Sequence, residues 1–188
     1  FLRGVERRIA AGLDPSVASV ASVFVSRWDA AVIKTAPEAL AGKLGVAIAA
    51  RTYKAYRELL TSPRYLRVCN EGVRPQRLLW ASTGVKDPRV SDLLYVKSLA
   101  APFTVNTMPD KTLEALADHG ALGDVPPSLL PFDGGDCEAV LKRFAEAGID
   151  VAALAKRLQV EGGETFVKSW TDLMAVLDKK SAALEHAA

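Results

Sequence analysis

Three polar side chains stand where apolar segments of the sequence end, and their types suit the binding of an anion. Arg27 follows one such segment, and Ser82 ends another just before a turn at Gly84. A guanidinium can bind two oxygens of an anion at once and stays charged at any working pH. A hydroxyl beside the free backbone N–H groups of a glycine turn forms a concave anion site. Lys86 can add a point charge, so the sequence predicts an anion site.

A purely structural interpretation stands beside the functional one for each of these residues. Arg27 can be a surface arginine in a strand–helix loop, Ser82 an ordinary turn residue, and Lys86 a solvated side chain. Residue type and position do not separate the two interpretations, because charged and turn residues are common in loops.

The sequence offers no pattern for metal or disulfide chemistry. Cys69 and Cys137 lie far apart and outside any CxxC, and His119 and His186 form no cluster with metal-ligand spacing. We therefore expect reduced thiols in a cytoplasmic protein that needs no metal.

Composition excludes several further classes of function. The 188 residues are 49% hydrophobic and 24% charged, with a net charge of +2, which is typical of a soluble globular protein. No apolar run approaches the roughly 20 residues that a membrane-spanning helix needs. Lys and Arg are spread out and nearly balanced by acids, so neither a nucleic acid nor a membrane is expected as a partner.

Three short strands, each followed by a helical pattern, are expected to position the polar residues. The strands are Val17–Val25, Arg77–Ser82 and Phe103–Met108. The repeated order of strand, loop and helix predicts parallel strands joined by right-handed crossovers, and therefore an α/β fold. The helices are expected over residues 1–12, 37–60, 64–70, 91–99 and 110–119.

The last third of the chain predicts a helical region after a Gly/Pro-rich loop from Gly120 to Gly135. Asp136 and Asp150 are expected to cap two helices, and Gly162–Gly163 to break the chain before a third. That third helix carries an apolar stripe expected to pack on the body of the protein. The sequence thus predicts two regions, a strand–helix part over residues 1–120 and a helical extension over residues 121–188. The apolar stripe consists of Phe166, Trp170, Leu173 and Leu177.

Three segments together resemble transaldolases of the longer bacterial type. They are SVASVFVSRWD at residues 19–29, RPQRLLWASTGVKDP at 74–88 and DLLYVKSLAAPFTVNTMP at 92–109. Each segment alone is a weak signal, whereas their order and spacing over most of the chain are specific. The resemblance implies the C-terminal portion of a (β/α)8 TIM-type barrel, strands six to eight, with an appended helical region.

The resemblance also implies an activity. Such enzymes transfer a dihydroxyacetone unit between sugar phosphates in the pentose phosphate pathway through a lysine Schiff base, without metal or organic cofactor. Donors would be sedoheptulose 7-phosphate or fructose 6-phosphate, and acceptors glyceraldehyde 3-phosphate or erythrose 4-phosphate. The family's lysine lies on strand four, which would precede Phe1. No catalytic residue is therefore expected within these 188 residues, and this stretch alone is expected to be inactive.

Matching positions assign substrate contacts to residues near the strand ends. The arginine and the serine at these ends are expected to bind phosphate, and the lysine stands near a position where many relatives have an arginine. Ser22 and Phe24 alternate with valines and match a serine and an aromatic residue of the family's substrate cavity. For Phe24, ordinary packing in the core is the alternative role. Asn106 and Thr107 either line the cavity or form strand-end hydrogen bonds. The predicted substrate-binding set is Arg27, Ser82, Lys86, Ser22 and Phe24.

Two questions remain open from the sequence alone. Lys86 is the only lysine here with an expected cationic neighbour, so it is the one candidate nucleophile in the chain. The family resemblance speaks against it, because the family's nucleophile occupies a buried strand position instead. The chain also opens at Phe1 inside an amphipathic pattern, which suggests a longer protein whose N-terminal barrel half is in the same or a separate chain. Alternatives are another barrel phosphosugar lyase and a catalytically empty half-barrel that serves as a scaffold.

Overall fold

The structure, a computed structural model, describes residues 1–120 and 130–185 and contains a three-stranded parallel sheet. The chain divides into two compact units, Phe1–Ile149 and Asp150–Ala188. In the first unit β1 (Val20–Phe24), β2 (Arg77–Ala81) and β3 (Thr104–Asn106) lie side by side in that order. Both pairs are parallel, which confirms the predicted α/β pattern of three adjacent strands.

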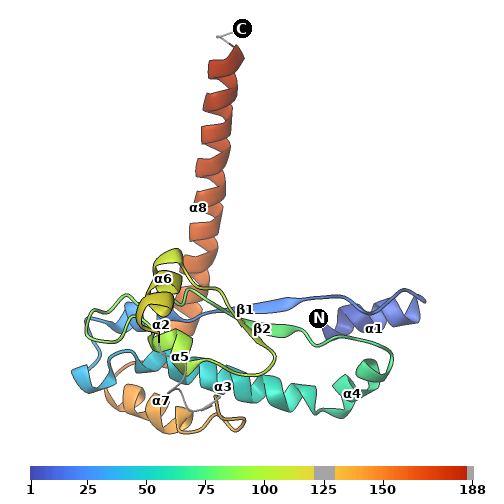
Figure 1. Cartoon of the computed structure of the whole chain (residues 1–188), viewed down its shortest axis with the longest axis horizontal. Helices are drawn as coiled ribbons and strands as arrows, with labels where there is room; N and C mark the ends of the chain where they lie inside the picture. The colour runs from blue at the N-terminus through green and yellow to red at the C-terminus, as the bar shows by residue number, and fades with distance from the viewer. Residues whose placement is uncertain (121–129, 186–188) are drawn as a thin grey trace. The chain divides into compact units, whose positions relative to one another are not determined.

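Helices connect and cover these strands, most of them where the apolar periodicity predicts them (Figure 1). The predicted helix over residues 37–60 is interrupted, because Gly42 adopts φ +68° and ends a short 3-10 turn before the long helix begins. The helices of the first unit are α1 (Leu2–Ala10), α2 (Ser26–Val32), η1 (Glu38–Leu40), α3 (Lys43–Leu60), α4 (Pro63–Asn70), α5 (Leu94–Ser98), α6 (Asp110–His119) and α7 (Cys137–Glu146).

The two faces of the sheet differ sharply in burial. Leu78 and Trp80 of β2 are 5% and 0% exposed, and they face α3, which runs alongside β1 and β2 (Figure 1). In register across the strands, Ser22 pairs with Leu79 and Phe24 with Ala81. These side chains alternate with the buried ones, so they share the opposite face. No strand residue on that opposite face is fully buried within the described parts of the chain, and we call it the open face.

A layer of helices lies behind the sheet. α7 packs on α3, burying Cys137, Leu141 and Phe144, while the exposed pair Arg51–Glu138 joins the same two helices by a bidentate ion pair. Trp80 is anchored through its indole N–H, which donates to the carbonyl of Leu99 at 3.0 Å. The apolar core of the first unit therefore lies between the sheet and the α3–α7 layer.

A buried carboxylate ties α2 to two other helices. Asp29 is 7% exposed and accepts hydrogen bonds from the backbone N–H groups of Leu44 and Gly45, both at 3.0 Å. The hydroxyl of Tyr95 in α5 donates to the same carboxylate at 2.7 Å. Burial raises the pKa of Asp29, although these three hydrogen bonds act in the opposite direction. A negative charge at the first turn of α3 is also favoured by the helix dipole.

Replacing Tyr95 by phenylalanine is expected to destabilise the protein by about 1.5–3 kcal/mol at neutral pH, because a hydrogen bond to a buried charge is lost. Tyr56→Phe is the matched control. Tyr56 is also buried, but its hydroxyl has no hydrogen-bond partner among the described residues, so its removal should cost nothing. Urea unfolding of both variants measures the difference, and equal losses would contradict the assigned role of Tyr95.

The loss of stability caused by Tyr95→Phe should depend on pH. Because the folded-state pKa of Asp29 is raised, its contribution to stability is present below the ordinary pKa and is lost as pH rises through the raised value. Below that value the carboxyl is protonated, and the bond from Tyr95 is an ordinary one worth about 0.5–1.5 kcal/mol. The loss caused by Tyr95→Phe should therefore be smaller below the raised pKa of Asp29 than above it.

The second unit consists of one long helix, α8 (Val151–Glu185). The predicted break at Gly162–Gly163 is wrong, because the helix runs through both glycines. Each glycine in a helix costs only about 1 kcal/mol, and the flanking residues are good helix formers. The predicted cap is confirmed for Asp150, whose side chain accepts from the N–H groups of Ala152 and Ala153 at 2.9 and 3.0 Å.

The predicted cap of α7 is wrong. The side chain of Asp136 forms no capping hydrogen bond, and its backbone angles of φ −85° and ψ 11° are not the extended ones that let an N-cap side chain reach forward. Much of the predicted loop over 120–135, and His186 at the end of the chain, lie outside the described residues. The predicted boundary between residues 120 and 121 adjoins that part and stays a prediction.

Candidate functional site

The carboxyl ends of β1 and β2 meet through a ladder that continues beyond both strands. The N–H of Val25 donates to the carbonyl of Ala81 at 2.9 Å, and the N–H of Ser26 to that of Ser82 at 3.0 Å. The two serine hydroxyls, Ser26 Oγ and Ser82 Oγ, lie 2.8 Å apart. The structure therefore brings Ser82 into direct contact with the residue that precedes Arg27.

Arg27 folds back over the aromatic residue at the end of β1. The guanidinium carbon lies 4.3 Å from the centre of the Phe24 ring, a cation–π contact. Phe24 belongs to the open face, so the cation lies at the carboxyl end of that face. Arg27 forms no hydrogen bond or ion pair with a described residue, so its five N–H groups are available to an anion.

Ser82 has an unusual backbone conformation that directs the next residue back into the protein. Its φ is +56°, a left-handed value that only a few residues other than glycine adopt. Thr83 follows, completely buried, and its hydroxyl lies 2.9 Å from both Asn106 Oδ1 and the carbonyl of Thr107. One hydroxyl proton serves only one of these acceptors at a time. Thr83 thus joins the turn after β2 to the end of β3.

Asn106 and Thr107 form strand-end hydrogen bonds, one of the two alternatives left open by the sequence. Besides the contact of Asn106 with Thr83, the N–H and hydroxyl of Thr107 both donate to the carbonyl of Trp80 at 3.0 Å. These bonds use polar groups that a cavity-lining role would need.

Lys86 lies in the loop after β2. Its side chain is exposed, and it forms no hydrogen bond or ion pair with any residue in 1–120 or 130–185. The following loop is held instead by Asp87, whose carboxylate pairs with Arg89 at 2.6 Å, and this pair lowers the pKa of Asp87. Ser22 is exposed on the open face, two residues before Phe24.

Sequence reasoning missed three polar residues that shape this region. Ser26, Asp29 and Thr83 are 1%, 7% and 0% exposed, and each hydrogen bond described above for them crosses to another element. Ser26 and Ser82 each follow an apolar strand, which is the only signal that could have paired them. The partners of Asp29 lie 15 to 66 residues away, so no local pattern reveals them.

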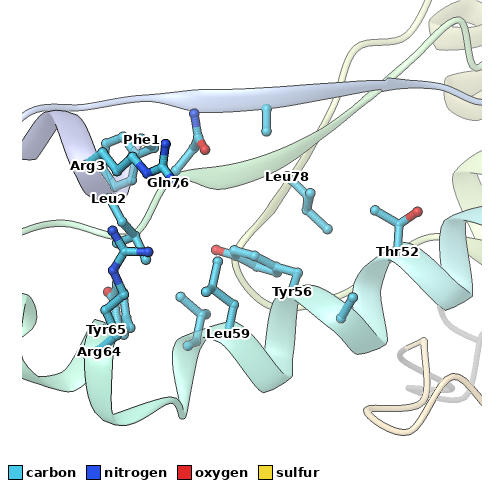
Figure 2. Close-up of a pocket in the computed structure, with 13 residues that line it drawn as sticks. Phe1, Leu2, Arg3, Thr52, Tyr56, Leu59, Arg64, Tyr65, Gln76 and Leu78 are labelled. Carbon is cyan, nitrogen blue, oxygen red and sulfur yellow. The ribbon is translucent and has the colours of Figure 1, made fainter.

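A cavity of about 530 Å³ lies elsewhere, between α3 and the amino-terminal parts of β1 and β2 (Figure 2). Most of its lining is apolar, including Leu59, Leu60 and Leu78, with Arg3 and Gln76 at one side. None of the predicted site residues lines it. Because active sites of parallel α/β barrels lie at the carboxyl ends of the strands, this cavity is not the candidate site.

Metal-binding clusters and membrane-spanning helices are both absent from the described residues. His, Cys, Asp and Glu side chains in residues 1–120 and 130–185 form no group able to hold a metal ion. No helix in the same ranges combines the length and the hydropathy needed to cross a membrane.

Comparison with known proteins assigns the chain to a family. The family model "Transaldolase/Fructose-6-phosphate aldolase" matches residues 5–177. A transaldolase of Parafrankia sp. (strain EAN1pec) is 46% identical over 182 residues, which are 93% of this chain and 48% of the relative. A transaldolase of Mycolicibacterium smegmatis is 44% identical over 93% of this chain and 48% of its own length.

A third relative is less similar and matches to a comparable extent. The transaldolase of Neisseria meningitidis serogroup A is 40% identical over 94% of this chain and 50% of its own length. The chain thus spans about half the length of the curated relatives it matches. Because the family model covers nearly all of its residues, the chain belongs to the transaldolase/fructose-6-phosphate aldolase family.

Proposed function

We propose that this chain is the phosphate-binding, C-terminal part of a transaldolase that transfers a dihydroxyacetone unit between sugar phosphates. One observation supports the assignment most strongly. Arg27, without an anionic partner among the described residues, lies over Phe24 at the carboxyl end of β1, and Ser82 directly follows the neighbouring strand β2. A bidentate cation and a hydroxyl donor both suit a phosphate, and this edge carries one of each.

The geometry of the lysines supports an upstream nucleophile. None of the lysines in the described residues lies in a β-strand, and Lys86 is exposed in a loop. A Schiff-base lysine must be partly unprotonated and held against the substrate carbonyl, which requires a buried or electrostatically tuned position. The reactive lysine therefore belongs to the half of the relatives that this chain does not span.

The sheet supports a barrel that is completed by further strands. β1 and β3 each leave one edge without a partner in the described residues, and the open face carries the apolar residues Leu79 and Val105, which are only partly buried. In a (β/α)8 barrel both edges pair, and the inward face fills the interior. The three strands then correspond to strands six to eight, completed by an N-terminal half in the same or a separate chain.

The apolar stripe of α8 fits the same arrangement. Phe166, Trp170, Leu173 and Leu177 are 48–63% exposed. We propose that the stripe packs on the completed barrel. Cys69 and Cys137 are free thiols, which fits a reducing cytoplasm.

Arg27→Ala tests the phosphate site in the longer, complete enzyme. Loss of a charged hydrogen-bonding contact is worth about 1.5–3 kcal/mol, so KM for phosphorylated donors should rise about ten- to hundredfold. The control is Arg7→Ala, which removes an exposed arginine of α1 and should leave KM unchanged. Lys86→Ala should have a smaller effect than Arg27→Ala. A normal KM for Arg27→Ala with a raised KM for Lys86→Ala would relocate the phosphate.

A further inference from the structure

We propose that Ser26 is a positioning residue that holds Ser82 and Arg27 in the geometry needed to bind a phosphate. The proposal rests on the phosphate site proposed above and adds a residue to which that site assigns no role. Ser26 does not touch the anion. It acts through its neighbours from a buried position, with 1% of its surface exposed.

A bound anion decides which of the two serine hydroxyls donates the hydrogen bond between them. Ser26 Oγ and Ser82 Oγ are 2.8 Å apart, and either can donate. Phosphate oxygens accept hydrogen bonds, so Ser82 must give its single proton to the anion. Ser26 is then the donor to Ser82 Oγ, and this bond selects the rotamer in which the Ser82 proton points away from Ser26.

The backbone of Ser82 depends on the same neighbour. A φ of +56° is unfavourable for serine and persists only where surrounding contacts enforce it. Ser26 makes two such contacts, through its N–H to the Ser82 carbonyl at 3.0 Å and through its hydroxyl to the Ser82 hydroxyl. Thr83, hydrogen-bonded to the end of β3, restrains the turn from its other side.

Ser26 also restrains the helix that carries Arg27. Ser26 and Asp29 are three residues apart, so they lie on one face of α2, and both are buried. Arg27 is directed away from that face and over Phe24. Two anchors, Ser26 on Ser82 and Asp29 on α3 and α5, therefore fix the side of α2 from which the guanidinium projects.

A double-mutant cycle tests the inference, with inorganic phosphate titrated calorimetrically into the longer, complete protein. Ser26→Ala should weaken phosphate binding about three- to tenfold, the effect of one neutral hydrogen bond. If Ser26 acts through Ser82, Ser26→Ala should weaken binding less in a Ser82→Ala background than in the wild type. Ser26→Cys keeps the size but donates weakly, and it is expected to lie between wild type and Ser26→Ala.

A kinetic readout separates positioning from general destabilisation. Ser26→Ala should raise KM for a phosphorylated donor but not for the same sugar without phosphate, and kcat with the unphosphorylated sugar should not change. A merely structural loss would affect both sugars alike, and that result would overturn the inference.

The possible failures are distinguishable. Phosphate binding by wild type that disappears in Arg27→Ala but is unchanged in Ser26→Ala and Ser26→Cys would overturn the role of Ser26 and leave the proposed function standing. Fully additive losses in the double variant would also overturn it. No phosphate binding by wild type would overturn the proposed site together with this inference.

Discussion

The 188-residue chain alone is expected to show no transaldolase activity, and activity is expected only when the upstream half of the barrel is present. Schiff-base chemistry needs an unprotonated amine held against a ketose carbonyl. An exposed lysine with an ordinary pKa near 10.4 is almost entirely protonated at neutral pH. The described lysines lie on helices or in loops, so none has the buried strand position that the resemblance implies for the nucleophile.

Borohydride trapping measures this expectation directly. The chain and the longer protein are each incubated with fructose 6-phosphate, reduced, and mapped by peptide mass. The expected adduct lies only in the longer protein, on a lysine outside residues 1–188. An adduct on Lys86 in the 188-residue chain would instead place the nucleophile here and overturn the split of the active site.

Gly45→Ala is expected to destabilise the protein, whereas the same methyl addition at Gly4 or Gly163, which also lie within helices, is not. A Cβ at Gly45 would lie 2.6 Å from Asp29 Oδ2 and 2.8 Å from the backbone carbonyl of Val25. Relief requires either the carboxylate or the strand end to move, and both are tied by hydrogen bonds. Overpacking costs about 1–3 kcal/mol, and a lost bond to the charge adds about 1.5–3 kcal/mol.

Gly4→Ala is the matched control for that substitution. Gly4 lies inside α1, and a Cβ there meets nothing within 4 Å. Alanine should therefore stabilise the protein by about 0.5–1 kcal/mol, through helix propensity alone. Urea unfolding of the two variants gives the comparison. A Gly45→Ala protein as stable as wild type would show that α2 and α3 can separate without cost.

Gly45→Ala is also expected to weaken phosphate binding at the candidate site. Asp29 lies two residues after Arg27 on α2, so a displaced carboxylate displaces the helix that carries the guanidinium. Phosphate affinity and stability should fall together in this variant. In Arg27→Ala, by contrast, phosphate affinity should fall while stability is preserved.

Much of the fold follows from local sequence patterns. Apolar runs interspersed with small residues predict the three strands, and the order of strands and helices predicts that the strands are parallel. The cap of α8 by Asp150 is an equally local feature, because its carboxylate accepts hydrogen bonds from the N–H groups two and three residues ahead. Such features depend on neighbours in the chain, and a single sequence contains that information.

The misjudged elements depend on neighbours in space. Helix α2 is only seven residues long and is anchored by Ser26 on Ser82 and by Asp29 on α3, contacts that no periodicity reveals. The error at Gly162 and Gly163 has a different cause, because the helix-forming residues on both sides outweigh the two unfavourable glycines.

The candidate site divides in the same way. The types of Arg27 and Ser82, and their positions after apolar strands, indicate an anion site as one of two interpretations, because guanidinium and hydroxyl chemistry belongs to the residues themselves. Only the tertiary structure decided that Ser82 contacts Ser26, that Arg27 lies over Phe24, and that Lys86 is exposed in its loop. The contact of Ser82 with Ser26 depends on parallel strands placing residues 56 positions apart at one edge of a sheet, which is a property of chain packing rather than of any segment.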